Sequence, residues 1–189
     1  TAYNPPRPWI ASYAPGVPAE LDLPTGSLYD LVAASIEEFG PNVALEFFGK
    51  TTTYAEMGSQ IDRAAEGLRL LGVQKGDPVA LVLPNCPQHI VAFYAVLRLG
   101  AIVVEHNPLY TPRELKAQLA DSGARAIVIL ENFAHVLEEV IEDTAIETAI
   151  VTGAGDLLDF PRSALTNLVV RHVRRQVPEW SLPDAGRFN

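Results

Sequence analysis

The sequence has one cysteine, one methionine and no long uninterrupted apolar run. With Cys86 as the only thiol, an intrachain disulfide is impossible, and a reducing compartment is the simpler interpretation. No run of about 18 apolar residues predicts a membrane-spanning helix. No charged and then apolar leader opens the chain. We therefore expect a cytoplasmic protein whose membrane contact, if it has any, is peripheral at the inner membrane face.

Basic residues are also few: 14 lysines and arginines stand against 23 aspartates and glutamates, for a net charge of −9. Such a balance argues against nucleic acid as the main partner, because phosphate backbones repel an acidic surface. Hydrophobic residues make up 48% of the 189 positions. That content predicts a packed core in one domain rather than a disordered chain.

Apolar runs at 79–83, 101–104 and 126–130 alternate with helical patterns, and a fourth run follows at 149–152. Strands that are buried on both faces have unbroken apolar runs, and helices between them make parallel crossovers. The sequence therefore predicts an α/β fold. We expect a layered, mostly parallel sheet with crossover helices on both faces.

Helix starts and turns can be placed locally. Ser27 is expected to open a helix that closes at Gly40-Pro41, and residues 43–54 are expected to form a small hairpin. The pairs Thr53/Glu56 and Thr111/Glu114 have the spacing of capping boxes, and Asn85 is a candidate cap for a helix over 86–99. Further helices are expected at 133–142 and 161–176, the latter with an apolar stripe (Leu165, Leu168, Val169, His172 and Val173).

The helix over 86–99 is apolar nearly all round, so it needs a second covering layer besides one sheet. Another subdomain or a second copy of the chain could supply that layer. We therefore expect self-association through this helix or through the proline-rich N-terminus. The expected organisation is an arm over 1–26, an α/β subdomain over 27–176 and an irregular tail over 177–189.

Glu105, His106 and Asn107 are the candidate ligand-facing residues, because they follow a predicted parallel strand. Open α/β sheets bind ligands at the carboxyl ends of their strands. No catalytic constellation accompanies them. Cys86 precedes a proline at a helix start but has no assigned histidine base, and no metal-ligand spacing links the histidines.

Two glycine patterns resemble nucleotide-binding loops only in part. Gly49-Lys50-Thr51 lies in a predicted hairpin, and Gly153-Ala154-Gly155 lacks the third glycine of a dinucleotide fingerprint. A turn is the preferred interpretation of the first, and a helix-entry loop is the preferred interpretation of the second. The arginines at 171–175 fit cations favoured by a helix C-terminus, or a surface that faces anionic lipid or a partner.

Three segments resemble the N-terminal part of the adenylate-forming enzymes: FFGKTTTYAEM (47–57), GVQKGDPVALVLPNCPQHIVAFYAVLRLGAIVV (72–104) and NPLYTPRELKAQLADSGARAIV (107–128). The flanks are similar to bacterial long-chain fatty-acyl-CoA ligases: RPWIASYAPGVPAELDLP (7–24) and VTGAGDLLDFPRSALTNLVVRHVRRQVPEWSLPDAGRF (151–188).

The resemblance implies a parent enzyme that joins a fatty acid to CoA through an acyl-adenylate, using ATP and Mg²⁺. The family's phosphate loop, its Tyr-Gly-x-Thr-Glu motif, its ribose-binding aspartate and its C-terminal lysine match nothing here. We therefore expect an N-terminal fragment that is inactive alone and binds no cofactor itself. On this hypothesis its partners are the missing C-terminal parts of the same enzyme, against which it packs, and it contributes part of an acyl pocket.

Glu105-His106 departs from the family, whose members carry small or amide residues there. A standalone, non-catalytic α/β interaction or small-ligand module is the alternative hypothesis. A nucleotide-binding Rossmann protein is a third, against which the broken glycine patterns count.

Overall fold

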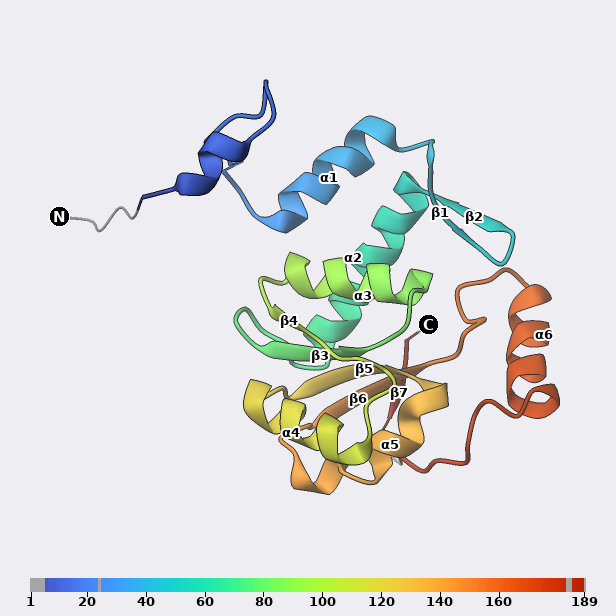
Figure 1. Ribbon diagram of the computed structural model, residues 1–189. Coiled ribbons are helices and arrows are strands. Elements are labelled where there is room, and N and C mark those ends of the chain that lie inside the picture. The colour runs from blue at the N-terminus through green and yellow to red at the C-terminus, as the bar shows by residue number, and fades with distance from the viewer. Residues whose placement is uncertain (1–5, 24, 183–184, 189) are drawn as a thin grey trace.

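A five-stranded parallel sheet forms the centre of the protein, as the computed structural model shows for residues 6–23, 25–182 and 185–188 (Figure 1). The strand order is β4-β3-β5-β6-β7, and each neighbouring pair is parallel. The strands are β3 (Pro78–Val82), β4 (Ile102–Glu105), β5 (Ala126–Leu130), β6 (Thr148–Thr152) and β7 (Gly186–Arg187). The predicted fold class is confirmed.

Helices cover both faces of this sheet (Figure 1). On one side lie α1 (Leu28–Phe39), α2 (Tyr54–Leu70) and α3 (Pro87–Arg98); on the other lie α4 (Pro112–Ser122) and α5 (Ala134–Glu138). Side chains alternate between the two cores along each strand, because successive residues of a strand point to opposite faces. Leu81 and Val128 belong to the core under α2 and α3, whereas Val82 and Ile127 belong to the core under α4.

The second layer over α3 comes from the chain itself. Helix α2 packs along α3, and α1 packs on both of them. The expectation that another subdomain or a second copy covers α3 was therefore wrong. It failed because sequence periodicity does not show which helices of one chain lie together. Self-association remains a prediction, but an uncovered α3 no longer supports it.

Capping residues fix the helix starts largely as expected. Ser27/Asp30, Thr53/Glu56 and Thr111/Glu114 each form a reciprocal capping box. The predicted Asn85 cap is wrong, because Cys86 is the N-cap residue of α3 and its side chain makes no capping bond. Pro87 follows it and has no N–H that needs a partner at the first helical position.

The predicted hairpin consists of β1 (Val43–Phe47) and β2 (Lys50–Thr53), which pair antiparallel. Phe48 and Gly49 both have positive φ, 48° and 71°, as a two-residue hairpin turn requires. The Lys50 ammonium donates to the Leu157 carbonyl (3.0 Å) and to Asp159 (2.7 Å). Gly49-Lys50-Thr51 is therefore part of a turn, as the preferred interpretation predicted, and Lys50 also connects the hairpin to the loop after β6.

Three segments differ from their predictions. The helix expected over 133–142 is interrupted, because Val140 leaves helical geometry at φ −127°. It consists of the 3₁₀ turn η2 (Glu131–Phe133), α5 and the 3₁₀ turn η3 (Ile141–Asp143). The helix expected over 161–176 is α6 (Arg162–Leu168) followed by a π-helical turn, η4 (Val169–Val173), and its apolar stripe does not face the core. Strand β7 lies in the segment expected to be an irregular tail.

The proline-rich arm holds one 3₁₀ turn, η1 (Pro8–Ser12), and its Trp9 and Tyr13 rings are partly exposed. Residues 1–5 and Pro24 of the predicted arm, and residues 183, 184 and 189 of the predicted tail, lie outside the described residues. None of the helices in the described ranges has both the length and the hydropathy needed to cross a membrane.

Candidate functional site

The carboxyl edge of the sheet holds the polar residues that the sequence selected. Glu105 ends β4, and His106 and Asn107 follow it in the loop toward α4. The backbone N–H of His106 still donates to the Leu81 carbonyl of β3 (3.0 Å), so the ladder continues to the start of this loop. These three residues therefore occupy the strand-end position that their spacing predicted.

Glu105 faces the start of α3. Its Oε1 lies 2.8 Å from His89 Nε2, and both side chains are partly exposed. His89 also lines a groove of about 350 Å³ together with Cys86 and the β1 residues 44–47. The Glu105–His89 pair thus joins two elements at one edge of the sheet, and a polar ligand there would meet both an acceptor and a ring nitrogen.

His106 turns inward, with only 4% of its surface exposed. Its Nδ1 lies 3.0 Å from the Val104 carbonyl, which can only accept, so Nδ1 carries the proton of a neutral ring. Burial lowers the pKa of His106 below its ordinary range, which keeps that ring neutral at pH 7. Its Nε2 is buried and has no partner among the described residues.

Asn107 is exposed and shapes its own loop. Its side-chain oxygen accepts from the Leu109 N–H (3.0 Å), and its carbonyl accepts from the Tyr110 N–H (3.0 Å). Such a turn directs the chain from the end of β4 into the capping box at Thr111. Asn107 thus fixes the backbone beside Glu105 and His106.

Cys86 is buried, and burial raises the pKa of its thiol above the ordinary range. A nucleophilic cysteine needs a lowered pKa, because the thiolate is the reactive form. Its environment therefore fits a small core side chain at the start of α3.

A polar network that the sequence analysis did not identify connects α3 to the loop after β6. Gln88, fully buried on a mostly apolar helix, donates from Nε2 to the Gly153 carbonyl (2.9 Å). Asp156 accepts from the Gly153 N–H (2.7 Å) and from the Asn167 amide (2.7 Å). The available signal was the Gly153-x-x-Asp156 spacing, which suits a carboxylate that caps a turn. This network holds α3, the loop after β6 and α6 together.

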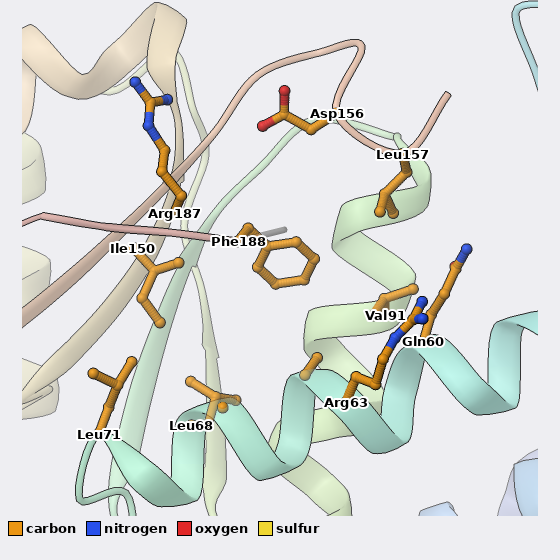
Figure 2. A pocket seen from close by; sticks show the side chains of 12 residues that line it. Gln60, Arg63, Leu68, Leu71, Val91, Ile150, Asp156, Leu157, Arg187 and Phe188 are labelled. Carbon is orange, nitrogen blue, oxygen red and sulfur yellow. The ribbon is translucent and has the colours of Figure 1, made fainter. Parts of the chain in front are cut away.

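A cavity of about 510 Å³ lies on the α2 side of the sheet (Figure 2). In the figure, Leu68, Leu71 and Ile150 lie at one end and Gln60, Arg63 and Val91 at the other, with the ring of Phe188 between them. Most of the lining is apolar, with the polar side chains of Gln60, Arg63, Asp156 and Arg187 among it, so the cavity offers mainly apolar contact.

The site contains no recognisable reaction centre within the described residues. No group of three or more histidine, cysteine, aspartate or glutamate side chains gathers there as metal ligands. The arrangement can bind and position, because it offers a carboxylate, an imidazole and amides at one sheet edge.

The chain matches the family described as AMP-binding enzyme over residues 32–181. It is 43% identical over 182 residues to a long-chain-fatty-acid–CoA ligase of Escherichia coli O157:H7, covering 95% of this chain and 32% of that relative. A Bacillus subtilis protein of the same description is 36% identical over 159 residues, covering 84% of this chain and 28% of its own. The chain thus spans about a third of the length of these relatives.

Solved structures give the same picture. A long-chain-fatty-acid-CoA ligase from Archaeoglobus fulgidus superposes with a TM-score of 0.65 at 30% identity, covering 74% of this chain and 29% of that one. An anthranilate CoA ligase bound to anthranoyl-AMP has a TM-score of 0.66 at 22% identity and shows the shared fold alone; the match covers 87% of this chain and 30% of that one.

Proposed function

Because this chain belongs to the AMP-binding enzyme family, we propose that it forms the N-terminal portion of a long-chain fatty-acid–CoA ligase. The whole enzyme would convert a fatty acid, ATP and CoA to acyl-CoA, AMP and pyrophosphate through an acyl-adenylate. The observation that supports this most strongly is the 43% identity to the Escherichia coli ligase across 95% of the chain.

The proposed role of these residues is structural. They supply one sheet with its helical layers, on which the nucleotide-binding portion of the enzyme packs. ATP, Mg²⁺ and CoA are assigned to that other portion, and two features of the described residues support this for the metal ion and for the phosphates of ATP. These residues contain no cluster of metal ligands, and Lys50 is held by Leu157 and Asp159 rather than placed in a phosphate loop. The proposed location is cytoplasmic, with peripheral contact at the inner membrane face.

Glu105, His106 and Asn107 are proposed to line the ligand side of the sheet edge. Glu105 and Asn107 present exposed polar groups, and His106 anchors the loop from within. On this proposal, Glu105→Gln and Asn107→Ala raise the KM for the substrate that meets this sheet edge. The KM is measured in a whole enzyme that contains this chain. Asp121→Asn, an exposed carboxyl on α4, is the matched control and leaves the KM unchanged.

A chimera tests the ligase proposal directly. The region of the Escherichia coli relative that matches this chain is replaced by residues 1–189, and formation of palmitoyl-CoA is measured against the same relative with that region deleted. We expect the chimera to be active and the deletion protein to be inactive. A folded chimera with no activity, beside an active parent, would contradict the proposal.

The chain alone is expected to make no acyl-adenylate. The measurement is ATP–pyrophosphate exchange in the presence of palmitate, compared with a blank that contains no protein. Exchange above the blank would show that the residues of this chain suffice for adenylation, against the structural role proposed here.

A further inference from the structure

The segment formed by α6 and η4 contacts the rest of the protein through polar side chains. Asn167 accepts from the Gly155 N–H (2.8 Å) and donates to Asp156 (2.7 Å). One turn later, the Arg171 Nε donates to both carboxylate oxygens of Glu131 (3.0 Å each). Because Asn167 and Arg171 are four positions apart, they lie on the same helix face, and this face is the one that meets the protein.

The opposite face is apolar and open to solvent. Leu165 is 61% exposed, Leu168 53%, Val173 69% and the preceding Phe160 85%. A surface helix ordinarily turns its apolar stripe toward the core and its polar side chains toward water. Here that orientation is reversed, so the exposed stripe is available to an apolar surface outside this chain.

The charged side chains of the segment itself have one sign, and the carboxylate just before it, Asp159, is paired with Lys50 (2.7 Å). Residues 160–176 include Arg162, Arg171, Arg174 and Arg175 and no aspartate or glutamate, although the whole chain has a net charge of −9. Arg162, Arg174 and Arg175 are exposed, and no ion pair joins them to another residue in the described ranges. The surface that fits the stripe therefore combines apolar material with negative charge.

We propose that the α6–η4 face, defined by Phe160, Leu165, Leu168, Val173 and the exposed arginines Arg162, Arg174 and Arg175, docks on an anionic lipid bilayer. The apolar side chains enter the boundary between headgroups and acyl chains, and the arginines meet the lipid phosphates. The inference rests on the peripheral location proposed above and names the surface responsible for it.

A second copy of the chain fits this face less well. In a symmetric dimer the same patch meets itself, which would place three exposed arginines against three others. The exposed apolar part consists of four side chains, whereas a stable interface buries about 800 Å² on each partner. A bilayer needs no such area, because several weak insertions and charge contacts add together.

Vesicle co-sedimentation tests the proposal, with the 189-residue chain and vesicles of phosphatidylcholine, alone or with about a third phosphatidylglycerol. We expect binding to the anionic vesicles only. Arg174→Glu/Arg175→Glu should weaken it at least about 25-fold, since each arginine near an anionic surface contributes about fivefold. Leu165→Ser/Leu168→Ser should weaken it as well. The matched controls are Lys75→Glu/Arg113→Glu and Leu70→Ser/Leu109→Ser, which alter exposed residues elsewhere and should bind like the parent chain.

An environment-sensitive dye gives an independent readout. Leu168→Cys can be labelled selectively, because Cys86 is the only native thiol and is buried. Its emission should shift to the blue when anionic vesicles are added, whereas a dye at Leu70→Cys should not respond. Absence of vesicle binding, or binding that the α6–η4 variants leave unchanged, would overturn the proposal.

The experiments can also show that a second copy of the chain, or another part of the enzyme, covers the α6–η4 face instead of a bilayer. If Leu165→Ser/Leu168→Ser abolishes a dimer seen in sedimentation velocity while the parent chain ignores vesicles, the occupant is a second copy and the proposal fails. If the chain binds vesicles but the ligase chimera does not, another part of the enzyme covers the face and the proposal also fails. These assays contain no ATP, CoA or fatty acid, so their result is separate from that of the ligase test.

Discussion

The guanidinium of Arg171 donates hydrogen bonds to the carboxylate of Glu131, a residue forty positions earlier in the chain. Glu131 follows β5 and is only 1% exposed, whereas the Arg171 side chain is 37% exposed. A second guanidinium, that of Arg187 on β7, lies 3.9 Å from the same carboxylate. One buried charge thus connects η4, the carboxyl end of β5 and the edge strand of the sheet.

Arg171→Met is expected to destabilise the protein by about 2–4 kcal/mol, because it leaves the Glu131 carboxylate buried without its hydrogen-bonded cation. Glu131→Gln should cost less, since it removes the buried charge and leaves a cation that water can reach. Urea unfolding followed by circular dichroism measures both changes. Arg174→Met, at an exposed arginine three positions away, is the control and should stay within about 0.5 kcal/mol of the parent. Equal effects of Arg171→Met and Arg174→Met would contradict this account of the pair.

The sequence could predict those parts of the fold that depend on neighbouring residues. The capping boxes at Thr53 and Thr111 require only a residue three positions later. The unbroken apolar run at 126–130 predicts a strand that is buried on both faces, and all five side chains of β5 are buried. Strand β7 could not be predicted in this way. It has two residues and no period, and its pairing with β6 supplies the order that its sequence lacks.

The candidate site likewise has features that the sequence predicts and features that it does not. The position of Glu105, His106 and Asn107 follows from the rule that ligands meet the carboxyl ends of parallel strands. The inward turn of His106 and the pairing of Glu105 with His89 depend on elements that fold back from elsewhere in the chain. The sequence predicted the apolar stripe of α6 but not the side that it faces, because an amphipathic pattern identifies two faces but not which of them meets the protein. Asn167 and Arg171 decide the orientation through partners in other loops.

Thr53→Ala is expected to raise the pKa of Glu56 toward its ordinary value. Hydrogen bonds from the Thr53 backbone N–H and hydroxyl hold that pKa below the usual range, and the substitution removes only the hydroxyl. The rise should therefore be partial. A carboxyl titration by NMR measures it, and the pKa of Glu114, whose capping box uses Thr111, should stay unchanged as an internal control.

The lowered pKa of Glu56 also determines how pH affects the stability of the start of α2. A carboxyl whose pKa is lower in the folded state stabilises the fold above its unfolded pKa, and the stabilisation is lost as the pH falls through the folded pKa. In the parent chain, acid should therefore weaken the start of α2. In Thr53→Ala the loss on acidification should be smaller, and an unchanged acid dependence would contradict the role of the hydroxyl.

The buried ring of His106 should make the stability of the fold depend on pH in a second range, above that of Glu56. Burial lowers its pKa when the chain is folded, so the unfolded chain binds more protons as the pH falls below about 6.5. The stability due to the neutral ring is complete above that pH and declines below it. We expect His106→Phe to flatten the fall in unfolding free energy between about pH 7 and pH 5.5. His172→Phe, at an exposed ring, should keep the slope of the parent; a parent-like slope in His106→Phe would disprove the assignment.

Gly67 and Gly155 form the last comparison, because the same substitution should act in opposite directions at the two positions. Gly67 lies inside α2, and a methyl group added there would meet no atom within 4 Å. Gly67→Ala should therefore stabilise the protein by about 0.5–1 kcal/mol, since alanine restricts the unfolded chain and favours the helix. Thermal and urea unfolding measure this gain.

A methyl group at Gly155 would lie 2.7 Å from the Ser163 carbonyl oxygen and 2.8 Å from the Asn167 side-chain oxygen. One of these contacts involves the backbone of α6, so the helix must move away, and the bond from the Gly155 N–H to Asn167 weakens with it. Gly155→Ala should therefore cost about 1–3 kcal/mol, as overpacking at a close contact does. If Gly155→Ala were neutral while Gly67→Ala stabilised the chain, α6 would not be held against the loop after β6. The orientation that exposes Leu165 and Leu168 would then lose its structural basis.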